Sequence, residues 1–98
     1  MSPSPMPSMP AFPMTASVTV GPGGMLAYAP ASVDIAAGGT VNWTWNGDLT
    51  HSVTSNSGVF DSGVKLSGSF SFTFPTAGTF PYHCLVHGFV MSGTVVVH

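Results

Sequence analysis

Charge is what this sequence has least of. Charged residues make up only 4% of its 98 residues, and Lys65 is the single base against three aspartates. A typical globular domain is about one-quarter charged. Proteins that bind nucleic acids need clustered lysine and arginine to neutralise phosphates, so this composition excludes a nucleic-acid partner.

Cysteine is almost as scarce, because Cys84 is the only one. It cannot form an internal disulfide, which leaves a buried thiol, a reactive thiol or a metal ligand. No apolar run is long enough to cross a membrane, and no charged segment followed by an apolar core marks a signal peptide. Low charge and many serines and threonines favour an exported protein. We therefore expect a periplasmic or extracellular location, with a signal peptide that is not present in this chain.

The first 14 residues, MSPSPMPSMPAFPM, differ from everything that follows. They contain five prolines and four methionines and show no periodicity. Proline removes backbone donors and disfavours helices, so residues 1–14 are predicted to be a disordered arm or linker before one folded domain, residues 15–98. The methionine thioethers suit cuprous copper, although a plain linker is the favoured interpretation.

From residue 15 onward, short apolar alternations are separated by glycine and proline, which is typical of an all-β sandwich or barrel. In TVNWTW (40–45), Val41, Trp43 and Trp45 share one face and are predicted to enter the core. SFSFTF (69–74) places three phenylalanines on one face in the same way. Seven or eight such strands predict an all-β Greek-key β-sandwich, and no stretch shows a helical period.

Ligand-type side chains gather in YHCLVHGFVM, at residues 82–91. Three of them are predicted to share one loop between the last two strands: Cys84, His87 and Met91. A thiolate, an imidazole and a thioether suit copper in both of its oxidation states, and a blue-copper site needs one more imidazole. His51 is the obvious supplier, whereas His98 at the end of the chain is a poor candidate.

Each of these residues also has a structural interpretation. A free cysteine is often a small buried hydrophobe, so Cys84 alone proves nothing. Methionine fills gaps in cores, which is the alternative for Met91 and the role that we expect of Met25. The case for a metal site depends on the combination.

The chain resembles the cupredoxins, the type 1 blue copper proteins of the plastocyanin, amicyanin and azurin group, over about residues 16–97. Three runs carry the resemblance: YAPASVDIAAGGTVNWTWNGDLTHSV, FDSGVKLSGSFSFTFPTAGTFPYHC and CLVHGFVMSGTVVV. The resemblance implies a cupredoxin-like sandwich that binds one type 1 copper per chain. The ligands that it implies are His51, Cys84, His87 and Met91.

Two positions depart from the family pattern. Three residues separate His87 from Met91, whereas relatives with two residues between the cysteine and the second histidine usually have two or four. Ser52 follows His51, where the family often has an asparagine that joins the two ligand loops by hydrogen bonds.

The resemblance implies an electron carrier that cycles between Cu(II) and Cu(I), and not an enzyme. Redox proteins are expected to dock transiently near His87, Gly88, Phe89 and Val90, and the protein is expected to be a monomer. One alternative is a copper carrier that uses the methionine-rich arm.

A second, less favoured alternative comes from Tyr82-His83-Cys84, which resembles a segment of copper nitrite reductases. There the histidine helps to bind a second, catalytic copper at a subunit interface, and that copper takes three histidines. Only His83 and His98 remain uncommitted in this chain. His83 is therefore expected to be an exposed residue on the outer face of the sheet.

Overall fold

The structure is a computed structural model that describes residues 12–47 and 49–98. In this part of the chain the secondary structure consists of eight β-strands and one 3₁₀ turn. The elements, in order, are β1 (Thr15–Val20), η1 (Pro22–Gly24), β2 (Tyr28–Ala29), β3 (Ser32–Ile35), β4 (Gly39–Trp45), β5 (Thr54–Ser55), β6 (Ser69–Phe74), β7 (Gly78–Cys84) and β8 (Gly88–Val97).

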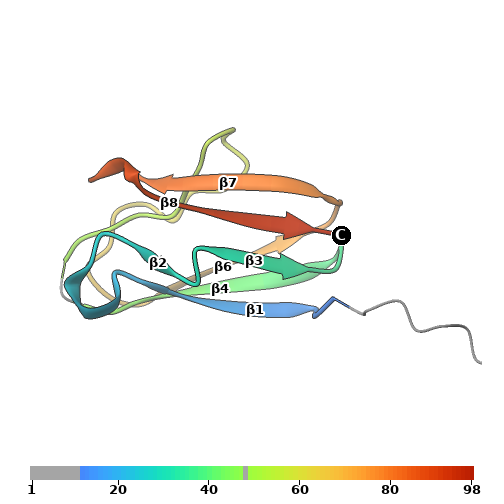
Figure 1. Cartoon of the computed structure of the whole chain (residues 1–98), viewed down its shortest axis with the longest axis horizontal. Helices are drawn as coiled ribbons and strands as arrows, with labels where there is room; N and C mark the ends of the chain where they lie inside the picture. The colour runs from blue at the N-terminus through green and yellow to red at the C-terminus, as the bar shows by residue number, and fades with distance from the viewer. Residues whose placement is uncertain (1–11, 48) are drawn as a thin grey trace, which may run out of the picture.

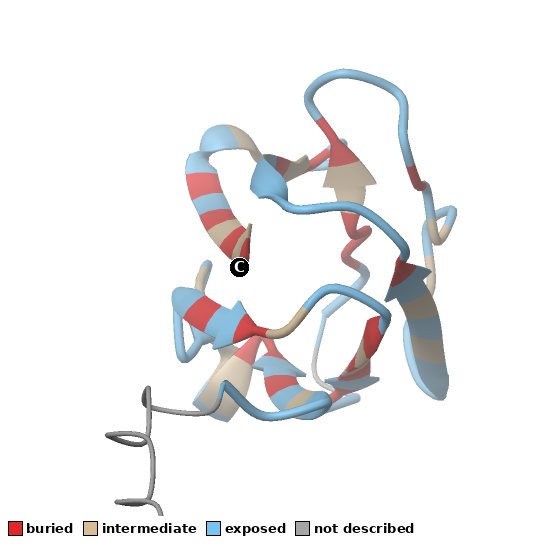
Figure 2. Cartoon of the chain, turned by 90° about the vertical axis from the view of Figure 1, so that its right-hand side faces the viewer, coloured by how far each residue is buried: buried red, intermediate tan, exposed pale blue. Residues whose placement is uncertain are grey.

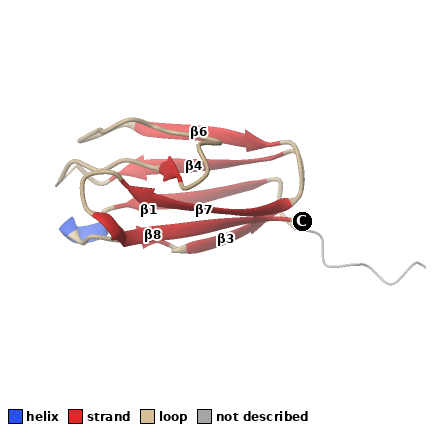
Figure 3. Cartoon of the chain, turned by 90° about the horizontal axis from the view of Figure 1, so that it is seen from above, coloured by secondary structure: helices blue, strands red, loops and turns tan. Residues whose placement is uncertain are grey.

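The strands form two four-stranded sheets that pack as two layers (Figures 1 and 3). One sheet has the order β2-β1-β4-β6 and the other β3-β8-β7-β5. Both sheets are mixed, because β1 pairs in parallel with β4 and β3 in parallel with β8, whereas the other pairs are antiparallel. The predicted all-β Greek-key sandwich is confirmed.

The core lies between the sheets and follows the period of two in the sequence. Along β4 the buried residues alternate, and Val41, Trp43 and Trp45 all point inward as predicted. Figure 2 shows the same alternation of buried and exposed bands on the other strands. Removing an aliphatic or aromatic side chain of this kind from water stabilises the fold by about 1.5–3 kcal/mol. The apolar faces of the strands therefore fix which side of each strand faces the other sheet.

Two details differ from the sequence prediction. The last strand begins at Gly88, so Met91 lies in β8 and not in the predicted loop. Met25 is 62% exposed, and the prediction that it packs in the core was wrong.

The predicted arm, residues 1–14, falls largely outside the described residues, so its disorder stays a prediction. Among residues 12–47 and 49–98, no helix is long and apolar enough to cross a membrane.

Gly93 in β8 provides a test of how tightly Tyr82, its cross-strand partner in β7, packs against it. A Cβ at this position would lie 2.5 Å from Cζ and Oη of Tyr82 and 2.9 Å from the carbonyl oxygen of Ala31. Tyr82 is fully buried, so its ring has no free space to move into. Gly93→Ala is therefore expected to lower the free energy of unfolding by about 1–3 kcal/mol in urea denaturation.

Ser92→Ala is the matched control, because Ser92 is exposed one position earlier in the same strand. Its effect is expected to stay within about 0.5 kcal/mol. Equal stabilities for the two variants would contradict the described packing.

Candidate metal centre

Cys84 is the last residue of β7 and lies at the end of the sandwich opposite the C-terminus (Figure 1). A bulge between His83 and Cys84 shifts the register, so that Cys84 pairs directly with Gly88. The intervening turn is closed by Gly88, whose φ of 71° favours glycine. This short turn brings His87 back toward the sulfur of Cys84.

His51 lies between β4 and β5, far from Cys84 in the sequence, and its side chain faces the Cys84 sulfur. Its backbone N–H donates to Lys65 O, and its carbonyl accepts from Lys65 N, both at 2.9 Å. The same carbonyl also accepts a hydrogen bond from the indole Nε1 of Trp45 at 2.9 Å, so the His51 backbone makes three in all. Trp45 was predicted to be a core residue only, and its orienting contact with His51 has no signal in the local sequence.

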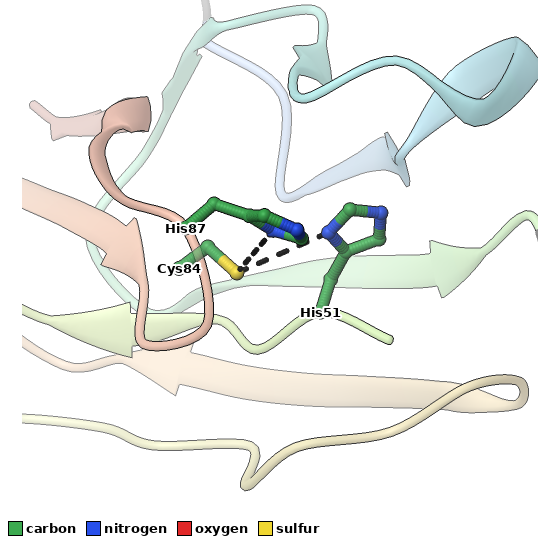
Figure 4. A group of neighbouring side chains, drawn as sticks. All are labelled: His51, Cys84 and His87. Carbon is green, nitrogen blue, oxygen red and sulfur yellow. Dashed lines mark hydrogen bonds between the residues drawn. The ribbon is translucent and has the colours of Figure 1, made fainter. Parts of the chain in front are cut away.

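The three side chains converge in the interior (Figure 4). The Cys84 Sγ lies 3.5 Å from Nδ1 of His87 and 3.9 Å from Nδ1 of His51. One ligand atom from each residue falls within 4.8 Å of the others. Cys84 and His51 are buried, whereas His87 is partly exposed. The structure thus brings together three of the four predicted ligands.

Ser52 joins the two ligand segments. Its backbone N–H donates to the Cys84 Sγ at 3.5 Å, and its Oγ accepts from the Leu85 N–H at 2.8 Å. Its carbonyl accepts from the Tyr28 hydroxyl at 2.6 Å. The serine therefore links the loops at the position where the family often has asparagine.

Comparison with known proteins agrees with this arrangement. A sequence profile described as "Copper binding proteins, plastocyanin/azurin family" matches residues 14–98. The chain belongs to this family.

Individual copper proteins are also similar to the chain in sequence and in structure. The chain is 34% identical over 87 residues to plastocyanin of Scenedesmus fuscus, covering 76% of this chain and 89% of the relative. It is 34% identical over 76 residues to amicyanin of Paracoccus denitrificans, covering 71% of this chain and 57% of the relative. The structure of a purple cupredoxin from Nitrosopumilus maritimus superposes with a TM-score of 0.74 at 26% identity, covering 85% of this chain and 99% of that one.

This cupredoxin is an electron carrier and not an enzyme, and its cofactor is one copper ion. The distances between the sulfur and the two nitrogens fit a bound ion of this size. Imidazole nitrogen and cysteine sulfur bind a divalent ion such as zinc at about 2.0 and 2.3 Å, which in a trigonal arrangement separates the two atoms by roughly 3.7 Å. The observed sulfur–nitrogen distances of 3.5 and 3.9 Å bracket this value.

The electrostatics of His51 also fit a metal. Its Nδ1 is the ring nitrogen that faces Cys84, at 3.9 Å from the sulfur. Burial lowers the pKa of His51 below its usual range, and the nearby His87 lowers it further. The neutral imidazole is the form that binds metal ions, so the site is ready to bind one near neutral pH.

Met91 is buried in the core with Cys84, whereas His83 lies outside the ligand cluster. The Met91 side chain is fully buried in β8 and belongs to the same core cluster as Cys84. His83 is half-buried, and its Nδ1 lies 2.6 Å from the Asn56 Oδ1. Its ring packs on Phe89 with a centroid distance of 4.5 Å. It is not a member of the metal-ligand cluster found among the described residues.

Gly21 determines how closely the chain approaches His51, and sequence reasoning missed this role. A Cβ on Gly21 would collide with the His51 imidazole. Gly21→Ala is therefore expected to weaken copper binding at least tenfold, beyond the loss of stability caused by its φ of 68°.

Gly23→Ala is the matched control, because Gly23 has a φ of 60° in the same turn and no atom within 4 Å of its Cβ position. Competition titration with a copper chelator measures both variants. If they bind copper equally well, contact with His51 is not what requires glycine at position 21.

Proposed function

We propose that the copper of this electron carrier would be held by His51, Cys84 and His87, with Met91 as a weaker fourth ligand. The observation that carries the proposal is the convergence of the first three ligand atoms within 4.8 Å. The burial of Met91, four residues after His87, supports its role as the fourth ligand. A cysteine, two histidines and a weak methionine form the ligand set of blue-copper electron-transfer sites.

The bound ion supplies a one-electron couple between Cu(II) and Cu(I). The chain's own contribution is to hold the ligands still and to exclude water. Cys84 is held by strand pairing, and His51 by three hydrogen bonds to its backbone. Both side chains are buried. A ligand frame that is fixed in this way changes little between oxidation states, which favours rapid electron transfer.

The β7–β8 turn is the proposed docking surface for redox partners. His87 is the ligand nearest to solvent, and around it the turn exposes apolar side chains: Leu85, Val86, Phe89 and Val90. Phe89 is 69% exposed and Val90 is 78% exposed. Exposed apolar residues that gather in one place mark interaction surfaces, and weak redox encounters use small ones. Gly88 allows the backbone of the turn to approach a partner.

The same reasoning leads to a monomer in the periplasm or outside the cell. All proposed ligands come from one chain, so the site does not require a second subunit. The low charge of the sequence and its many hydroxyl-bearing strands support export.

Titration with Cu(II) tests the ligand set. The unaltered protein is expected to bind one copper per chain and to show an intense visible thiolate-to-copper band that a reductant bleaches reversibly. Cys84→Ser is expected to abolish the band, because serine lacks the sulfur that produces it. His83→Gln, which alters the neighbouring residue outside the cluster, is the control and is expected to keep the band.

A band that persists in Cys84→Ser would refute the proposed site. Colourless binding that requires residues 1–14 would favour the copper-carrier alternative.

The docking surface predicts how the rate of electron exchange depends on salt. Electron self-exchange between oxidised and reduced copies, measured by NMR line broadening, is expected to change less than about twofold between low and physiological ionic strength, because few charges steer the encounter. Val90→Glu is expected to slow this exchange and to make it salt-dependent. Ala37→Glu places the same charge beside His98 at the opposite end and is expected to have little effect. Equal effects of the two variants would place the docking surface elsewhere.

A further inference from the structure

A chain of hydroxyl groups connects the Cys84 turn to the protein surface. The Leu85 N–H donates to the Ser52 Oγ at 2.8 Å. The Ser52 Oγ lies 2.8 Å from the Thr54 Oγ1, which donates to the Asp61 Oδ1 at 3.0 Å. Ser52 is buried, Thr54 is half-buried and Asp61 is exposed, so the chain runs outward from the core.

The direction of these hydrogen bonds is determined by the acceptor at the end. A hydroxyl has one proton, and Thr54 donates its proton to the Asp61 carboxylate, so Thr54 must accept from Ser52. The Ser52 proton therefore points toward Thr54, which leaves its lone pairs for the Leu85 N–H. Hydrogen bonds that run in one direction polarise one another, and this makes Ser52 a better acceptor.

The carboxylate at the outer end is itself held in place. The Asp61 Oδ1 also accepts from the Gly63 N–H at 2.9 Å, and Asp61 forms a β-bridge with Thr54. The acceptor therefore has a defined position, and it limits the rotation of both hydroxyls.

At the inner end, Ser52 contacts two successive residues of the turn. Its backbone N–H donates to the Cys84 Sγ, and its side chain accepts from Leu85. A serine side chain has three staggered rotamers, and the hydrogen bond to the Thr54 Oγ1 selects the rotamer in which the Ser52 Oγ faces Leu85. Loss of that acceptor would free the Ser52 hydroxyl and loosen the turn around the sulfur.

We propose that Thr54 and Asp61 are positioning residues for the copper site, which hold Ser52 and thereby keep the Cys84–Leu85 turn and the N–H···S hydrogen bond in place. The inference rests on the proposed role of Cys84 as a copper ligand. Hydrogen bonds to a ligating cysteine sulfur tune the reduction potential of a blue-copper site. The hydrogen-bonded chain of Ser52, Thr54 and Asp61 therefore contributes to the reduction potential of the copper, although neither hydroxyl contacts a metal ligand directly.

The test compares Thr54→Val with Thr54→Ser in the full chain. Valine has nearly the same shape but cannot accept or donate a hydrogen bond, whereas serine keeps the hydroxyl. In metal-free protein, Thr54→Val is expected to accelerate hydrogen exchange of the Leu85 amide by about three- to tenfold, as for the loss of one hydrogen bond. In copper-loaded protein it is expected to lower the reduction potential, because the N–H···S bond weakens. Thr54→Ser is expected to match the unaltered protein in both measurements.

Asp61→Asn provides a second test that does not alter a half-buried residue. It is expected to accelerate Leu85 exchange in the same direction by a smaller factor, because a neutral amide is a weaker acceptor. Asp34→Asn is its charge-matched control, since Asp34 pairs with His98 and is not part of the hydrogen-bonded chain. It is expected to leave Leu85 exchange unchanged.

Unchanged Leu85 exchange in both Thr54→Val and Asp61→Asn would overturn the proposal. So would a potential in Thr54→Val that equals that of Thr54→Ser. Hydrogen exchange of the Leu85 amide is measured without copper, so it does not depend on the proposed ligand set. If that ligand set is wrong, Leu85 exchange still changes in the variants, but the unaltered protein shows no thiolate-to-copper band.

Discussion

The link between Ser52 and the Cys84 turn is the contact on which the site depends. His51 and Cys84 are 33 residues apart and come from different segments of the sandwich, so no local structure brings their side chains together. Ser52 follows His51 directly and hydrogen-bonds both the sulfur of Cys84 and the amide of Leu85. A metal site must hold its ligands within about 0.5 Å of the productive geometry, and this link provides the necessary restraint.

Placing polar groups inside an apolar sandwich requires compensation, and the surrounding residues provide it. The carbonyl of His51 accepts from Lys65 and Trp45, and the carbonyl of Ser52 accepts from Tyr28. Each buried polar group left without a partner would cost about 1–3 kcal/mol. Three buried side-chain atoms among the described residues have no hydrogen-bond partner: Trp43 Nε1, Tyr82 Oη and the His51 Nε2, which is the ring nitrogen that does not face Cys84 (Figure 4). The backbone carbonyls of His51 and Ser52 are paired, and this helps to make the site rigid.

The two ends of the sandwich differ in chemistry. The end that carries the ligands exposes the apolar residues Phe89 and Val90, whereas the other end holds the pair of Asp34 and His98, with Phe12 stacked on the histidine. In a protein with so little charge, the apolar rim beside the partly exposed His87 is the feature that favours this end as the proposed docking surface. An electron carrier needs such a surface to be small, because its complexes must dissociate quickly.

The sequence by itself determined the features that depend on short-range patterns. Alternation along residues 40–45 identified the buried face of β4, and the spacing of Cys84 and His87 placed two ligand-type residues in one turn. Only the tertiary structure decided that Met91 lies in a strand, because a bulge at Cys84 lets the turn close early. It likewise decided the role of Gly21 against His51, since contacts between distant segments leave no periodic signal in the sequence.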